Sequence, residues 1–191
     1  METVKRIVLF ASGSGSNVEN IANFFQDDHR VLLKGVLCNN PQAGVVERCK
    51  RLGLPLYCFN RPAWLEEDSL LALLKSLEPD LIVLAGFLWK IPKAMVAAFP
   101  DKIINVHPAL LPKFGGKGMY GMHVHNAVIN SGERESGITI HRVNEAYDEG
   151  SILLQKKTAI QPGDTPEQLA EKIHALEYKH FPSTIAALLF P

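Results

Sequence analysis

The segment Asn105-Val106-His107-Pro108 places an amide and an imidazole two residues apart at the end of an apolar stretch. Side chains at positions i and i+2 of an extended chain lie on the same face. Pro108 favours an extended backbone at His107 and removes one backbone donor, so a strand is expected to end here. An amide donor and a protonatable ring directed at one point could stabilise a carbonyl oxygen that becomes negatively charged during nucleophilic attack. Taken alone, the segment fits a capped loop without chemistry equally well.

A carboxylate and a further histidine follow later in the chain. Asp148 lies in the polar stretch Tyr147-Asp148-Glu149-Gly150, just before an apolar strand, and could return to the same strand end. A carboxylate near His107 would favour the imidazolium and fix the orientation of the ring. The alternative for Asp148 is an ordinary surface turn. His141 alternates with Ile138 and Ile140, so it faces either solvent or a polar cavity.

A glycine-rich turn, Ser12-Gly13-Ser14-Gly15-Ser16-Asn17, separates the first apolar stretch from the first helical one. Backbone N–H groups at such a helix start suit an anion, typically a phosphate. A dinucleotide site is disfavoured because Val18 stands where the third glycine is needed and Cys38-Asn39-Asn40 offers no acid for a ribose. The turn also lacks the lysine of a triphosphate loop, so a monophosphate ester fits better. The alternative is a tight turn that needs small residues.

Two other chemistries are less well supported by the sequence. His123 and His125 could bind a metal, but no third ligand stands nearby, and no metal is expected. Ser14 lies between glycines, yet it lacks the spacing and triad of a serine hydrolase.

The periodicity of apolar residues predicts the elements that position these side chains. Short apolar strands alternate with amphipathic helices, which predicts a doubly wound α/β fold with a mostly parallel sheet covered on both faces. The terminal helix is expected to start near Asp164-Thr165-Pro166 and to be interrupted near Pro182. The expected strands cover residues 7–11, 34–38, 56–59, 80–85, 102–106, 137–143 and 151–155, and the earlier helices cover residues 17–25, 44–52, 64–77, 93–99 and 125–129.

Length, net charge and cysteine content limit the classes of protein and of partner that are expected. The chain has 191 residues, which favours a single domain over residues 1–191, and its formal net charge of +0 disfavours a nucleic-acid partner. The apolar run at residues 7–11 is too short for a membrane span, and no signal-peptide pattern precedes it. The 3 cysteines show no metal or redox spacing, so reduced thiols and a cytoplasmic location are expected.

The motifs together resemble the phosphoribosylglycinamide formyltransferase family, the folate-dependent glycinamide ribonucleotide transformylases. The resemblance covers nearly the whole chain. It rests on Gly13-Ser14-Gly15-Ser16-Asn17, Leu84-Ala85-Gly86-Phe87, Asn105-x-His107-Pro108-x-Leu110-Leu111-Pro112, Gly137-x-x-x-His141-x-Val143 and Asp148-x-Gly150, in this order.

The resemblance implies roles for individual residues. Asn105, His107 and Asp148 match the catalytic trio, with His141 as a supporting residue. Glycinamide ribonucleotide would be held by the glycine-rich turn and by Glu177, which matches the acid on the ribose hydroxyls. The full set expected to bind the nucleotide is Gly13, Ser14, Gly15, Ser16, Asn17, Gly86, Pro108 and Glu177, and that for folate is Phe87, Leu88, Trp89, Lys90, Ile91, Tyr147 and Asp148.

The implied fold is a seven-stranded, mostly parallel sheet with a Rossmann-like N-terminal half that holds the nucleotide phosphate. The folate cleft and catalytic loop would lie in the C-terminal half. The implied reaction transfers the formyl group of 10-formyltetrahydrofolate, as cosubstrate, to glycinamide ribonucleotide in purine synthesis. Trp89 departs from the arginine of many relatives, and the loop at residues 115–122 is longer, so no role is assigned to that loop.

Three rival functions use parts of the same pattern. Methionyl-tRNA formyltransferases share the trio but carry a tRNA-binding domain. A formyltetrahydrofolate deformylase would hydrolyse the same donor, and its relatives carry an N-terminal regulatory domain. A non-catalytic folate or nucleotide sensor would not need an intact trio. Small-molecule substrates, with neither nucleic acid nor membrane, are the expected partners, and the sequence does not indicate an oligomeric state.

Overall fold

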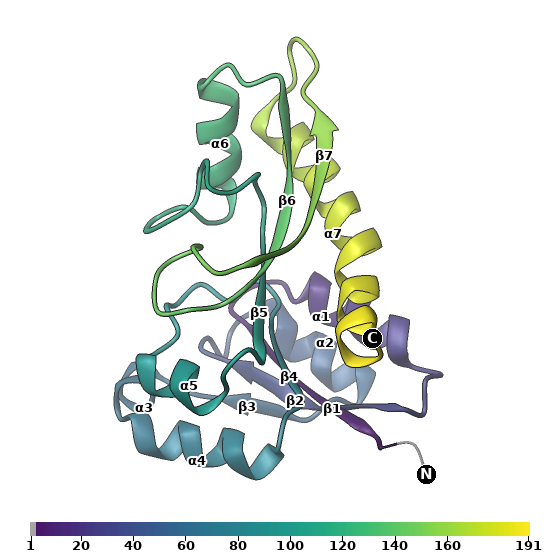
Figure 1. Cartoon of the computed structure of the whole chain (residues 1–191), viewed down its shortest axis with the longest axis vertical. Coiled ribbons are helices and arrows are strands. Elements are labelled where there is room, and N and C mark those ends of the chain that lie inside the picture. The colour runs from purple at the N-terminus through teal and green to yellow at the C-terminus, as the bar shows by residue number, and fades with distance from the viewer. Residues whose placement is uncertain (1–2) are drawn as a thin grey trace. The chain divides into compact units, whose positions relative to one another are not determined.

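Seven strands form one sheet in the order β3-β2-β1-β4-β5-β6-β7 in the computed structural model (Figure 1). The structure describes residues 3–191, with all side chains in that range except those of residues 67 and 68. Pairing is parallel between β1 and β2, β1 and β4, and β2 and β3, and antiparallel between β6 and β7. The predicted α/β class and seven-stranded, mostly parallel sheet are therefore confirmed.

The strands and helices follow the predicted alternation. The strands are β1 (Lys5–Ala11), β2 (Val31–Cys38), β3 (Leu56–Cys58), β4 (Leu81–Leu84), β5 (Ile103–His107), β6 (Glu135–Arg142) and β7 (Ile152–Ala159). The helices are α1 (Ser16–Phe25), α2 (Gly44–Leu52), α3 (Arg61–Leu65), α4 (Glu67–Leu77), α5 (Lys93–Ala98), α6 (Met122–Asn130) and α7 (Pro166–Leu189).

The chain divides into two compact units. Unit 1 holds the residues up to Ile104 together with Leu189–Pro191, and unit 2 holds Asn105–Leu188. The expectation of one domain over residues 1–191 remains a prediction, and its first two residues lie outside the described part.

Unit 1 contains the parallel strands β1 to β4. Their burial is nearly complete, since Ile7, Val8, Leu9 and Phe10 of β1 are all 0% exposed. Strands buried on both faces need helices on both sides. Figure 1 shows α1 and α2 on one side of these strands and α3 and α4 on the other.

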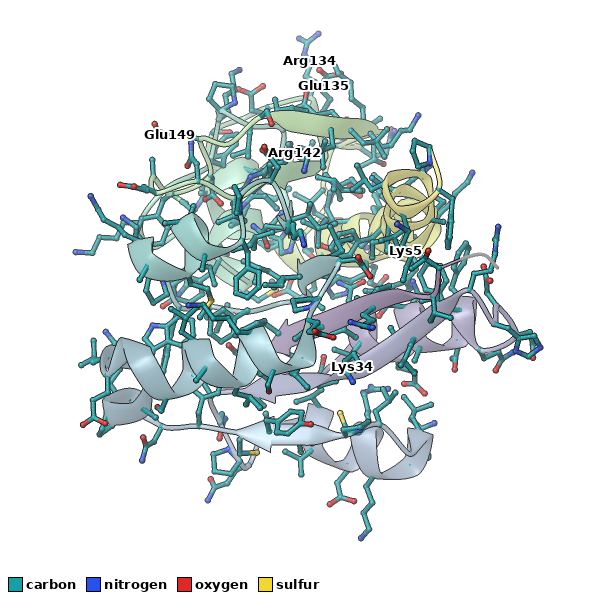
Figure 2. All side chains as sticks on the ribbon, turned by 60° about the horizontal axis from the view of Figure 1, so that its bottom comes forward. Lys5, Lys34, Arg134, Glu135, Arg142 and Glu149 are labelled. Carbon is teal, nitrogen blue, oxygen red and sulfur yellow. The ribbon has the colours of Figure 1, made fainter. Side chains whose placement is uncertain are left out.

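Unit 2 is built on the antiparallel pair β6 and β7. Their register runs from Glu135 opposite Ala159 to Ile140 opposite Leu154, and it shifts before His141. Charged side chains cover the outer part of this unit: Arg134 and Glu135 point away from it in Figure 2, and Lys157 donates to Glu135 over 2.6 Å. In Figure 1, α6 and α7 lie on either side of the strand pair.

Two details of the helices differ from the predictions. The helix expected over residues 64–77 is two helices, because Glu66 leaves helical geometry with a ψ of 85°. The interruption expected near Pro182 is wrong, since α7 continues through it. Proline removes one backbone donor. The hydroxyls of Ser183 and Thr184 donate to the His180 carbonyl beside it, and buried Phe181 and Ile185 hold the helix to the core.

The start of α7 is as predicted. Thr165 and Gln168 form a reciprocal capping box: the Gln168 N–H donates to Thr165 Oγ1 and the Thr165 N–H donates to Gln168 Oε1. Pro166 occupies the first helical position, where its missing N–H costs no intrahelical bond.

Candidate active site

The end of β5 carries the predicted amide and imidazole in unit 2. Asn105 is half-buried and His107 is only 3% exposed. His107 Nε2 lies 2.7 Å from the backbone carbonyl oxygen of Phe114. A carbonyl only accepts hydrogen bonds, so Nε2 carries the proton and donates it. The Nδ1 atom is left to face the carboxylate described next.

Asp148 lies between two histidine rings. Its Oδ2 is 3.6 Å from His107 Nδ1, and its Oδ1 is 3.6 Å from His141 Nε2. The Gly116 N–H donates to Oδ2 over 2.9 Å. Asp148 has a φ of 55°, a left-handed conformation that aspartate tolerates better than most residues. The carboxylate predicted from the sequence therefore returns to the strand end that holds His107.

His141 connects Asp148 with Asn105. Its Nδ1 lies 2.8 Å from the Arg142 carbonyl and so donates to it, while its Nε2 lies 3.2 Å from Asn105 Nδ2. In the neutral tautomer, Nε2 accepts one amide hydrogen from Asn105. Of the two orientations that the sequence left open for this ring, the structure has the buried one.

Burial controls the charge of both rings. Desolvation lowers the pKa of His107, although the carboxylate of Asp148 and the Phe114 carbonyl oppose it. Desolvation also lowers the pKa of His141, although the Arg142 carbonyl and the carboxylate of Asp148 raise it. The expectation that Asp148 holds His107 as an imidazolium remains a prediction, since burial disfavours the charged ring while the carboxylate favours it. A proton taken up at His107 Nδ1 would lie beside the Asp148 carboxylate.

The glycine-rich turn lies in unit 1 between β1 and α1. Gly15 caps α1 with a φ of 76°, and a Cβ there would lie 2.5 Å from Val45 Cγ2. Only glycine combines this conformation with this close approach. The Val45 N–H donates to the Gly13 carbonyl over 3.1 Å. The turn therefore packs closely against the start of α2, and Ser16 and Asn17 lie in the first turn of α1.

Two side chains that the sequence did not indicate support this turn. Arg48 of α2 donates through Nε to the Ser14 carbonyl over 2.7 Å, and it also pairs with Glu19 of α1. Arg51 donates to the same carboxylate over 2.6 Å. The charged residues that hold the turn come from a different helix, so local spacing gives no signal for them.

The segment expected to bind folate, residues 87–91, follows β4 in unit 1. The Ser12 N–H donates to the Gly86 carbonyl and the Leu88 N–H donates to Ser12 Oγ, each over 3.0 Å. These bonds tie the segment to the start of the glycine-rich turn. Phe87 and Ile91 are buried, whereas Leu88 is 47% exposed and Lys90 is exposed.

Trp89 belongs to an aromatic cluster of unit 1. Its ring lies 6.4 Å from that of Phe87 and 5.9 Å from that of Trp64. The guanidinium of Arg61 lies over its face, 4.8 Å from the ring centroid, which is within the range of a cation–π contact.

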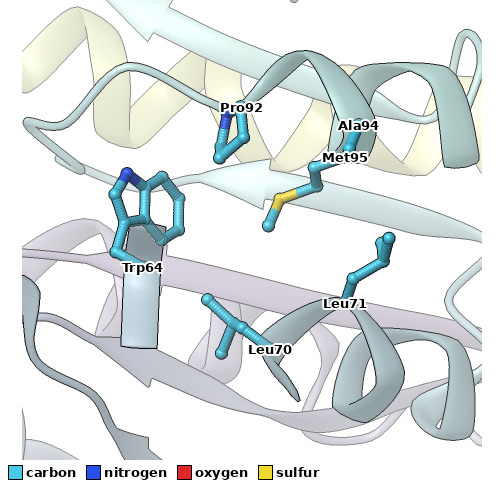
Figure 3. A pocket seen from close by; sticks show the side chains of 6 residues that line it. All are labelled: Trp64, Leu70, Leu71, Pro92, Ala94 and Met95. Atoms are coloured by element: carbon cyan, nitrogen blue, oxygen red, sulfur yellow. The ribbon is translucent and has the colours of Figure 1, made fainter. Parts of the chain in front are cut away.

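A small apolar pocket lies between the helices of unit 1 (Figure 3). The sequence-predicted site residues do not line it. Its lining residues are Trp64, Leu70, Leu71, Pro92, Ala94 and Met95.

The remaining predicted residues lie in unit 2. Glu177 of α7 is a buried acid at 7% exposure, Pro108 is half-buried, and Tyr147 is 39% exposed. His123 packs its ring against Tyr120. Among residues 3–191, apart from the side chains of residues 67 and 68, no group of three or more His, Cys, Asp and Glu is arranged to hold a metal ion.

Comparison with known proteins identifies the family. The model of the formyl transferase family matches residues 5–185. The chain belongs to the formyl transferase family. It is 36% identical over 193 residues to the phosphoribosylglycinamide formyltransferase of Bacillus subtilis, covering 97% of this chain and 95% of that protein. The resemblance found in the sequence is therefore confirmed.

Other members of the family are also similar to this chain over nearly its whole length. The chloroplastic phosphoribosylglycinamide formyltransferase of Arabidopsis thaliana is 40% identical over 96% of this chain, which spans 65% of the length of that relative. The crystal structure of the phosphoribosylglycinamide formyltransferase from Streptococcus pneumoniae TIGR4 has a TM-score of 0.87 at 32% identity, covering 97% of this chain and 99% of that one. Over the described residues, no helix is long and apolar enough to span a membrane.

Proposed function

We propose that this formyl transferase moves the formyl group of 10-formyltetrahydrofolate to the amine of glycinamide ribonucleotide, a step of purine synthesis. The observation that carries the proposal is the arrangement of Asn105, His107, His141 and Asp148 around one strand end of unit 2. The names of the relatives support the choice of substrates.

The reaction needs an oxyanion site and a proton acceptor. The amine nitrogen attacks the formyl carbon, the bond from that carbon to N10 of the folate breaks, and one proton moves from the amine to N10. The tetrahedral oxyanion would be stabilised by Asn105, whose amide has a second N–H besides the one given to His141.

Asp148 with its two histidines would take up the proton of the attacking amine. Protonation of His107 at Nδ1 places a positive charge 3.6 Å from Asp148 Oδ2, and this pairing offsets part of the cost of charging a buried ring. The same proton can then pass to the leaving nitrogen, directly or through water.

The glycine-rich turn would bind the phosphate of the nucleotide through Gly13, Ser14, Gly15, Ser16 and Asn17. Backbone N–H groups at the start of α1 favour an anion there. Glu177 would accept hydrogen bonds from the ribose hydroxyls, and Gly86 and Pro108 would complete the nucleotide site.

In unit 1, the residues proposed to contact the folate are Phe87, Leu88, Trp89, Lys90 and Ile91. In unit 2, Tyr147 and Asp148 are proposed for the same role. A flat aromatic ligand suits the exposed apolar side chain of Leu88.

The test is to mix the purified protein with 10-formyltetrahydrofolate, with and without glycinamide ribonucleotide, and to follow formylated nucleotide and formate separately. Formylated nucleotide that forms only with both substrates, and not with His107→Ala, supports the proposal. Formate without formylated nucleotide would indicate the deformylase. Neither product, with binding retained, would indicate the sensor.

The cellular context is proposed on weaker support. A cytoplasmic location is consistent with Cys38, Cys49 and Cys58, which are free thiols. Small-molecule substrates remain the expected partners. The Arabidopsis thaliana relative is chloroplastic, so location varies among relatives.

A further inference from the structure

The hydroxyl of Thr139 holds the backbone that follows His107. Thr139 lies on β6 and is 0% exposed. Its Oγ1 donates to the Ala109 carbonyl over 2.7 Å and accepts the Leu111 N–H over 3.0 Å. Both partners belong to the short segment that leaves β5 after Pro108.

Gln155 completes the hydrogen bonding of this hydroxyl. It stands directly opposite Thr139 in the register of β6 and β7. Its Nε2 donates to Thr139 Oγ1 over 3.0 Å and to the Leu111 carbonyl over 2.9 Å. A hydroxyl has one hydrogen to donate and two lone pairs to accept with, and Thr139 uses all three.

The same strand also holds the other end of the catalytic segment. His141 lies two residues after Thr139, so both side chains are on one face of β6. His141 bonds to Asn105, and Thr139 bonds to Ala109 and Leu111. The stretch from Asn105 to Leu111, with His107 in its middle, is therefore fixed to β6 at both ends.

We propose that Thr139, assisted by Gln155, is a positioning residue for the transfer step: its hydroxyl fixes the backbone between His107 and Phe114. The inference rests on the proposed function, because the step it affects is formyl transfer. Thr139 reaches the reacting atoms only through this backbone.

The backbone that Thr139 holds determines where the His107 ring and its Phe114 partner lie. The backbone at Ala109 determines the direction in which the chain leaves β5 after His107. The Phe114 carbonyl, which accepts the His107 N–H, comes three residues after Leu111. Without the hydroxyl, the buried Ala109 carbonyl and Leu111 N–H lose their hydrogen-bond partner, and the backbone shifts so that they can form other hydrogen bonds. A displacement of about 1 Å in a catalytic group can cost roughly a hundredfold in rate.

The test compares Thr139→Val with Thr139→Ser. Valine keeps the shape and removes all three hydrogen bonds, whereas serine keeps the hydroxyl. Thr139→Val should lower kcat by about tenfold to a hundredfold while the KM for glycinamide ribonucleotide stays within about twofold. Thr139→Ser should restore kcat to within a few fold. Gln155→Met should give a smaller loss of the same kind, and it serves in place of Thr139→Val if the valine variant does not fold.

Ser136→Ala is the matched control. Ser136 is another buried hydroxyl of β6, at 2% exposure, and its Oγ has no hydrogen-bond partner. Its removal should leave kcat unchanged. A loss of kcat in this variant as large as in Thr139→Val would overturn the proposal, because any cavity in β6 would then have the same effect.

A spectroscopic readout separates positioning from stability. In protein with ¹⁵N-labelled histidine, His107 should show a proton on Nε2, and Thr139→Val should change that signal while circular dichroism shows a folded protein. An unchanged His107 signal with unchanged kcat refutes the positioning role. If the wild-type protein itself fails to formylate the nucleotide, the proposed function fails instead.

Discussion

Two histidines flank one carboxylate at the proposed active site, and the hydrogen-bond partners of their other nitrogens determine what each can do. The Phe114 carbonyl fixes the proton of His107 on Nε2, and the Arg142 carbonyl fixes that of His141 on Nδ1. Both unprotonated nitrogens therefore face Asp148 at 3.6 Å. A proton released near Asp148 can be taken up at His107 Nδ1, since His141 Nε2 already accepts from Asn105. This arrangement suits a reaction that moves one proton between two nitrogens.

We expect Asn105→Ala, His107→Ala and Asp148→Ala each to lower kcat by roughly a hundredfold to a thousandfold, because each removes a donor or the proton acceptor. Binding of glycinamide ribonucleotide should change little, since the proposed phosphate site lies in the glycine-rich turn. Steady-state kinetics and calorimetric titration with the nucleotide measure the two effects. Near-normal rates in all three variants would contradict the mechanism.

The pKa of His107 in the ligand-free protein should lie below 6.5, because burial outweighs the attraction of Asp148. An NMR titration of the labelled histidines measures it. Removing the carboxylate in Asp148→Asn should lower this pKa further, since Asp148 opposes the effect of burial. A midpoint above 6.5 in the wild-type protein would restore the imidazolium expected from the sequence.

Residue types and spacing predicted Asn105, His107 and Asp148 but not what holds them. The i, i+2 spacing and Pro108 were enough to place an amide and a ring at one strand end. Asp148 was ambiguous because a carboxylate beside glycine is common in surface turns. The Phe114 carbonyl and the Gly116 N–H are backbone groups, which residue identity does not reveal.

At the level of the elements, apolar periodicity located every strand to within a few residues at each end. The predicted strand at residues 34–38 begins at Val31, because the polar Lys34 and the following glycine hide the earlier part. The break at Glu66 and the continuity through Pro182 depend on packing in the folded protein. Local propensity therefore could not predict either.

The close approach of α2 to the glycine-rich turn leads to a prediction for Gly15. We expect Gly15→Ala to weaken binding of glycinamide ribonucleotide by at least about tenfold, because the new Cβ would meet Val45 at 2.5 Å with φ at +76°. Calorimetric titration measures the affinity, and kcat at saturating nucleotide should change much less. Gly53→Ala is the control, since Gly53 also has a positive φ, at +66°, but a Cβ there meets nothing within 4 Å. Equal affinity in both variants would contradict a shape-dependent cradle.

For the molecule as a whole, buried histidines link stability to pH. His125 of α6 is 3% exposed and its Nδ1 has no hydrogen-bond partner. Burial, with nearby His174 and His107, lowers its pKa to about 4 from 6.5. The unfolded chain therefore binds this proton more readily than the native protein.

The native protein should consequently lose stability as the pH falls from about 6.5 to about 4, by roughly 3 kcal/mol from His125. Above pH 6.5 the contribution is constant, because the ring is neutral in both states. Urea unfolding at pH 7.5 and 4.5 measures the difference. His125→Leu should show a smaller difference, while His29→Asn, at an exposed position, should resemble the wild type. An unchanged pH dependence in His125→Leu would contradict the assignment.

The overall architecture was predictable because alternation of strand and helix leaves few topologies. The division into two units could not be predicted from the sequence, because no linker or change in composition marks residue 104. Strand β5 runs across the boundary without interruption.

The loop that carries Asp148 is closed at its base by contacts between backbone groups. The Arg142 N–H donates to the Ser151 carbonyl over 2.9 Å, and a Cβ on Gly150 would lie 1.7 Å from the Arg142 carbonyl oxygen. This bond and the close backbone approach at Gly150 tie the two ends of the loop together. For protein engineering, the part of the loop at residues 143–146 can therefore be exchanged while Tyr147 and Asp148 are kept. The register of β6 and β7 should be preserved in such variants.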